Sequence, residues 1–106
     1  MADESPGVVP MVSYRDGPAA MDWLAAAFGF REEVRWLDDE GVLTHAEMLA
    51  GRGRIMLATP TVDYEGPLLH RSHCDYAAAW SRVPWVIDGV LVYVDDIASV
   101  ESRIVV

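Results

Sequence analysis

A histidine and a glutamate two positions apart are the most chemically suggestive residues of this chain. Residues 41–60 predict two strands joined by a tight turn at Gly51-Arg52-Gly53, where glycines can adopt positive φ angles. Alternate side chains of a strand share a face, which here groups Leu43, His45, Glu47 and Leu49. A carboxylate can fix the tautomer of a neighbouring imidazole, so the pair could act as a general acid and base. Alternatively, both face solvent, or His45 forms a hydrogen bond with a neighbouring strand. Residues i and i+2 of a strand lie about 7 Å apart and need not touch.

A second group of potential ligands lies further along the chain, in the sequence HRSHC. His70, His73 and Cys74 could bind zinc, or the cysteine could act as a nucleophile with a histidine base. A closed zinc site needs four ligands, however, and the chain has one cysteine. The alternative is an exposed loop that contains these residue types incidentally.

Aromatic residues are dense in the same irregular region. Their large contact area would suit closure over an apolar or aromatic ligand. Alternatively, they seal the edge of a sheet or are buried against a partner subunit. The residues concerned are Tyr64, Tyr76, Trp80 and Trp85.

Composition restricts the class of protein. The 106 residues suffice for one small domain, and the hydrophobic content of 52% suffices for a core. A net charge of −9 argues against nucleic acid and anionic membranes as partners. The N-terminal residues lack the pattern of a signal peptide, no apolar run approaches the roughly 18 residues of a membrane span, and a lone cysteine fits a reducing compartment. We therefore expect a cytoplasmic protein.

The residues ahead of these candidates predict a strand and then a helix. Residues 8–14 are apolar enough for a strand, and Pro10 restricts it to an edge or to the outermost register. Asp16-Gly17-Pro18 is a helix-start signal, and the helix should extend to Phe28 and end at Gly29. Helical spacing predicts a buried stripe of Met21, Leu24, Ala25 and Phe28.

Three further strands are expected before residue 60. Residues 31–37 form the first of them, with one charged, exposed face, and residues 38–41 form a turn before the hairpin. Short turns make these strands an antiparallel meander. The first strand must join the same sheet, since the helix has one apolar stripe and needs a sheet face to cover.

The C-terminal part repeats the start of this pattern. Residues 89–94 predict a strand, ended by Asp95-Asp96, and a helix could begin at Ile97. Residues 11–21 and 91–101 both have an apolar strand, a tyrosine, a polar pair ending in aspartate and a helix start. This similarity suggests an incomplete second copy of the strand–helix–three-strand unit. The alternative is a closing strand and a tail.

In this order the segments resemble the vicinal oxygen chelate superfamily, which includes glyoxalase I, bleomycin-resistance proteins and extradiol dioxygenases. The matching segments are the first strand with Asp16, MDWLAAAFGF, THAEMLAGRGRIML and VLVYVDDI. The resemblance covers residues 8–60 well and 89–98 moderately. It implies an α+β fold in which two βαβββ modules form an open cup around a ligand.

The resemblance also implies where metal ligands would lie in metal-using members. On this sequence those positions fall near Val9, Met56 and Gly89, none of which has a side chain that binds a hard divalent cation. We therefore expect no cofactor, with a divalent metal ion as the alternative.

Together these observations predict a disordered leader (1–7), a complete βαβββ module (8–60), an aromatic-rich loop (61–88) and a truncated second module (89–106). Dimerisation or strand exchange would complete the cup, unless the chain is a shortened form whose missing half does so. The expected function is metal-free binding of a small organic molecule by a homodimer. The alternative is a metal-dependent lyase or dioxygenase, or a metal-free isomerase that uses His45 and Glu47. The expected ligand-binding residues are Met11, Ser13, Met56, Trp80 and Trp85.

Overall fold

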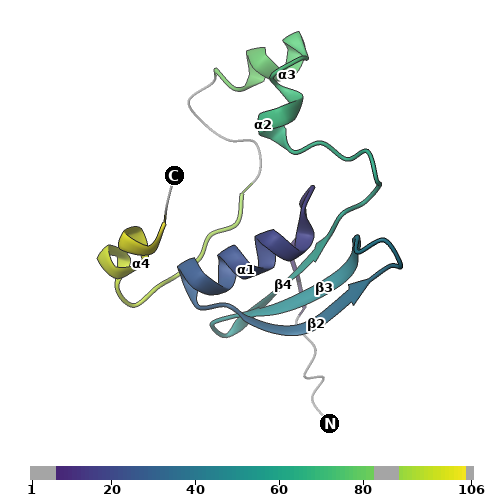
Figure 1. Ribbon diagram of the computed structural model, residues 1–106. Helices are drawn as coiled ribbons and strands as arrows, with labels where there is room; N and C mark the ends of the chain where they lie inside the picture. Colours follow the sequence, from purple (N-terminus) through teal and green to yellow (C-terminus); the bar gives the residue numbers. More distant parts are fainter. Residues whose placement is uncertain (1–6, 83–88, 105–106) are drawn as a thin grey trace.

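A four-stranded mixed sheet with a helix across one face organises the chain (Figure 1). The computed structural model describes residues 7–82 and 89–104. The sheet order is β1-β4-β3-β2, with β1 parallel to β4 and the other pairs antiparallel. The predicted order of strand, helix and three strands is confirmed, with these bounds: β1 (Met11–Ser13), α1 (Gly17–Phe28), β2 (Arg31–Leu37), β3 (Leu43–Ala50) and β4 (Gly53–Ala58).

Strand β1 is shorter than the predicted 8–14. It pairs with β4 over three residues, and the ladder continues through Met56 N, which donates to Pro10 O at 2.9 Å, and Tyr14 N, which donates to Ala58 O at 3.1 Å. Because proline has no N–H, Pro10 can accept but cannot donate in this ladder. The strand is accordingly an edge strand, as predicted.

Local signals determine both ends of α1. Asp16 Oδ1 accepts a hydrogen bond from Ala19 N at 3.1 Å, which satisfies a free N–H of the first turn. At the other end, Gly29 has a φ of 74° and its N–H donates to Ala25 O at 3.0 Å. The buried face differs from the predicted stripe, because Ala27 is buried and Ala25 is exposed. The helix lies on the sheet through Gly17, Met21, Leu24 and Ala27.

The β3–β4 hairpin turns on two residues. Ala50 pairs with Gly53, so Gly51 and Arg52 form the turn, and of the two flanking glycines only Gly51 has a positive φ, at 64°. A positive φ at the first central position alone is the pattern of a type II′ turn.

The start of β3 departs from strict alternation. The β2–β3 register shifts between Trp36 and Leu37, so Leu43 points into the core at 0% exposure instead of sharing a face with His45. Such a bulge reverses the facing of the residues before it. The core therefore lies between α1 and one sheet face, and consists of Met21, Leu24, Phe30, Leu43, Ala46, Met48, Ile55 and Leu57.

The predicted strand at residues 89–94 is wrong. The structure has no strand there, although Val92 packs against the core. A strand needs a partner edge, and the nearby edge strand β1 is only three residues long. The helix expected to begin at Ile97 is present as α4 (Ile97–Arg103), and Arg103 Nε donates to Ala27 O at 3.0 Å.

The region between β4 and residue 82 contains two short helices, α2 (Pro67–His70) and α3 (Asp75–Trp80). The predicted helical turn at residues 75–80 is therefore confirmed. Figure 1 shows both helices standing clear of the sheet. No helix in the described part of the chain has both the length and the apolar character needed to cross a membrane.

The close approach of α1 to β3 provides a test of this packing. A Cβ at Gly17 would lie 2.5 Å from Leu43 Cβ, so Gly17→Ala should lower the free energy of unfolding by about 1–3 kcal/mol. Helix propensity alone would favour alanine, so the direction of the change is diagnostic. Urea unfolding measures it.

The matched control is Gly66→Ala. No atom lies within 4 Å of a Cβ at Gly66, and its φ of −67° suits any residue. Its free energy of unfolding should stay within about 0.5 kcal/mol of the parent. Equal stability of Gly17→Ala and the parent would contradict the described helix–strand contact.

Candidate functional site

The sheet face opposite α1 is the candidate site, and we call it the open face. Strand pairing aligns Met11 with Met56, Met56 with Glu47, and Glu47 with Val34, so one row of side chains crosses all four strands. Every member of this face is exposed or half-buried. The open face comprises Met11, Ser13, Val34, Trp36, His45, Glu47, Leu49, Arg54, Met56 and Ala58.

Five of the seven residues predicted from sequence to form a site lie on this face. They are Met11, Ser13, His45, Glu47 and Met56. Trp80 lies on α3, which stands apart from the sheet (Figure 1). Its side chain is exposed. Trp85 lies outside the described residues. The roles assigned to these residues remain predictions.

His45 and Glu47 are in contact, although two residues on one strand face need not be. His45 Nε2 lies 3.0 Å from Glu47 Oε2. The other carboxylate oxygen, Oε1, accepts from Arg54 Nη1 at 3.0 Å, and Arg54 also pairs with Glu33. Glu47 therefore joins an imidazole and a guanidinium, and its two oxygens are used in different directions.

These contacts determine the ionisation of the pair. The hydrogen bond with His45, followed by the charge of Arg54, holds the pKa of Glu47 below its ordinary value. An ionised carboxylate only accepts hydrogen bonds, so His45 Nε2 is the donor. In the neutral imidazole, Nδ1 then has the free lone pair and is the atom that could accept a proton from a ligand.

Two residues of the open face that contact the His45–Glu47 pair were not predicted from the sequence. Arg54 lies two residues before Met56 on β4, so the two side chains share a face of the sheet. This spacing could have placed Arg54 beside Glu47. Trp36 pairs with His45, and their ring centroids lie 5.1 Å apart.

The facing of β2 also corrects a prediction. Its charged side was expected to be exposed; Glu33 is exposed, but Arg35 is half-buried and points toward α1, where its Nη2 donates to Asp22 Oδ1 at 3.1 Å. Val34 and Trp36 consequently face away from α1, which leaves the side chain of Trp36 62% exposed. Apolar surface on the open face is therefore larger than the sequence pattern indicated.

The metal positions implied by the family resemblance do not fit an ion here. Met56 occupies the β4 position on the open face, and Val9 and Gly89 supply no side-chain ligand. Within the described residues, the group of three side chains that could hold an ion lies elsewhere, around α2.

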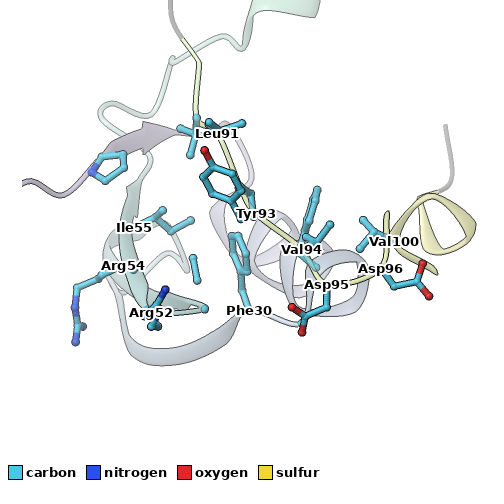
Figure 2. Close-up of a pocket in the computed structure, with 18 of the residues that line it drawn as sticks. Phe30, Arg52, Arg54, Ile55, Leu91, Tyr93, Val94, Asp95, Asp96 and Val100 are labelled. Carbon is cyan, nitrogen blue, oxygen red and sulfur yellow. The ribbon is translucent and has the colours of Figure 1, made fainter. Parts of the chain in front are cut away.

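A hollow of about 890 Å³ lies on the other side of the sheet, beside the β3–β4 hairpin. Figure 2 shows Phe30 and Ile55 on the side of the sheet and Leu91 and Tyr93 on the facing segment. None of the residues predicted from the sequence to form a site lines this hollow. The sequence did not predict this hollow, because residues 89–94 were expected to pair as a strand.

These features define a small α+β protein with a βαβββ sheet and one uncovered face. No protein-family model matches the chain, and no curated protein matches it. Among solved structures, TioX from Micromonospora sp. ML1 is similar, with a TM-score of 0.53 and 24% sequence identity over 92% of this chain and 67% of that chain. At this identity the similarity shows a shared fold.

The His45–Glu47 contact predicts a pKa change that can be measured. His45→Gln should raise the pKa of Glu47 toward its ordinary value, because the largest stabilising contact of the carboxylate is weakened. Carboxyl carbon chemical shifts followed against pH measure this pKa. His70→Gln, on a distant helix, should leave it unchanged.

The lowered pKa of Glu47 makes the free energy of unfolding depend on pH. Since folding lowers the pKa of Glu47, the stability that it contributes is present above the unfolded-state pKa and is lost as the pH falls through the folded-state pKa. His45→Gln should therefore narrow the stability difference between neutral and acidic pH. An unchanged Glu47 pKa in this variant would contradict the contact.

Proposed function

We propose that this chain is a glyoxalase/bleomycin-resistance-like protein whose open face binds a small organic molecule without a metal ion. The fold shared with TioX and the order of segments that resembles the vicinal oxygen chelate superfamily support this assignment. The supporting observation for the site is the open face itself. It places the apolar side chains of Met11, Met56 and Trp36 around a few convergent polar groups.

This mixture is typical of small-molecule sites, which are mostly apolar with a few fixed polar groups that orient the ligand. Here Glu47 is held between His45 and Arg54, so the polar groups are positioned before any ligand arrives. Trp36, which pairs with His45 on the edge strand β2, adds a rigid aromatic surface beside this cluster. The acidic chain and its lone cysteine support a cytoplasmic location as part of the same proposal.

A homodimer would complete the cup. Met11 and Trp36 are 74% and 62% exposed, although both belong to residue types that favour burial. A sheet face with this much apolar surface is normally covered by another layer. A second copy placed face to face would supply that layer and leave a cavity between the two polar clusters.

Sedimentation velocity tests the dimer. The sedimenting species of the native protein should have twice the chain mass of 11.7 kDa. Met11→Glu should shift the population to monomer, since a charge buried in an apolar interface is strongly unfavourable.

Tyr76→Glu is the matched control, because Tyr76 is similarly exposed, at 84%, but lies on α3. It should leave the dimer intact. A monodisperse monomer of the native chain, or equal effects of the two variants, would contradict the completed cup.

Tryptophan fluorescence tests the ligand site. A panel of small aromatic ligands should include members that change the emission of the native protein, because Trp36 lies on the open face. Trp36→Phe should remove most of that response. Trp23→Phe is the control, since Trp23 lies on α1, outside the open face, and is also partly exposed, at 43%.

If no ligand of the panel changes the tryptophan emission, the proposed binding of a small aromatic molecule is contradicted. A response that survives Trp36→Phe and disappears with Trp23→Phe would place the ligand on the helix side of the sheet and contradict this site.

The His45–Glu47 contact favours one alternative, a metal-free isomerase. In that reaction His45 Nδ1 would remove a proton from one atom of the ligand and the imidazolium, stabilised by Glu47, would return it to another atom. Recovery of the bound ligand chemically unchanged supports the binding function. Conversion of the ligand that Glu47→Gln abolishes would support the enzyme instead.

A further inference from the structure

Two histidines and a glutamate gather around α2, in a part of the chain that the proposed cup does not use. Glu65 precedes α2, His70 ends it and His73 follows it. Glu65 Oε2 lies 3.6 Å from His70 Nδ1 and forms a hydrogen bond with His73 Nε2. One potential ligand atom from each residue lies within 4.8 Å of the other two.

Backbone hydrogen bonds hold the three positions on one scaffold. His70 N donates to Gly66 O at 2.9 Å, and His73 N donates to His70 O at 3.3 Å. Pro67 begins the helix with a restricted φ. The imidazole rings meet edge-on, with centroids 5.6 Å apart and planes at 76°. This arrangement lets a nitrogen of each ring approach Glu65.

We propose that Glu65, His70 and His73 bind a divalent transition-metal ion, with Zn²⁺ as the best match. Two imidazoles and a carboxylate suit zinc and its neighbours, whereas magnesium and calcium prefer oxygen ligands. Bonds of about 2.0–2.1 Å place the ligand atoms of a tetrahedral ion about 3.3 Å apart. The 3.6 Å between Glu65 Oε2 and His70 Nδ1 is already close to that spacing.

Cys74 is not part of this group, although its sequence position beside His73 suggested it. It is the N-cap residue of α3 and begins the next helix. Glu65 supplies the third ligand instead, and three protein ligands leave the fourth position for water. The signal in the sequence is Glu-x₄-His-x₂-His, in which the two histidines lie three residues apart.

The site is accessible to an ion from solution. The side chains of His70 and His73 are 51% and 54% exposed, and that of Glu65 is 35% exposed. Substitution of these residues should therefore leave the core intact. Loss of metal binding can then be assigned to loss of a ligand.

Isothermal titration of Zn²⁺ into the full chain, after treatment with a chelator and desalting, tests the proposal. We expect one ion per chain. Affinity should fall by at least about tenfold in each of Glu65→Gln, His70→Gln and His73→Gln, since even outer partners of metal ligands contribute roughly 10- to 100-fold.

His45→Gln is the matched control, because His45 is the remaining histidine of the three in the chain. Its affinity for Zn²⁺ should equal that of the native protein. Absence of Zn²⁺ binding, or affinity retained in both His70→Gln and His73→Gln, would overturn the site, as would an equal loss in His45→Gln.

Nuclear magnetic resonance of the native protein provides an independent measurement. Addition of Zn²⁺ should shift the imidazole signals of His70 and His73 and leave those of His45 in place. A shift confined to His45 would contradict the proposal, whether or not the variants fold.

Discussion

A single helix has one apolar stripe, whereas a sheet has two faces. Helix α1 uses its stripe on one face, where Gly17 allows the helix to approach Leu43 closely. The segment from residue 89 and α4 add to the same side, through Val92 and Arg103. The opposite face consequently retains both apolar side chains and a polar cluster. The proposed cup and dimer depend on this asymmetry.

Histidine–glutamate contacts occur in two places in the described residues, and they differ in how they are held. His45 and Glu47 lie on β3, fixed between two neighbouring strands, and Glu47 is also paired with Arg54. The group around α2 rests on a short helix and a turn, and two imidazoles share one carboxylate. Both oxygens of the Glu47 carboxylate are paired, one with His45 and the other with Arg54, whereas the ion-pair partners of Glu65 in the described residues are the two histidines themselves. Acid–base chemistry or ligand orientation therefore suits the first contact, and metal binding suits the second.

The similarity between residues 11–21 and 91–101 has a partial structural counterpart. Asp16 and Asp96 are both N-cap residues, accepting from the N–H three positions later at 3.1 and 3.2 Å. The strand that precedes the helix forms only in the first copy. A cap needs a few neighbouring residues, but a strand also needs a partner edge, and the second copy has no pairing strand in the described residues.

The sequence by itself determined what depends on neighbours along the chain: the cap at Asp16, the stop at Gly29, the hairpin turn at Gly51, and the element order of the βαβββ module. It also placed His45 and Glu47 on one face, because strand alternation is local. Only the tertiary structure decided that a bulge sends Leu43 into the core, that Arg54 pairs with Glu47, and that Glu65 rather than Cys74 joins the two histidines. These contacts depend on strand register and chain reversal, which are set by packing between distant segments.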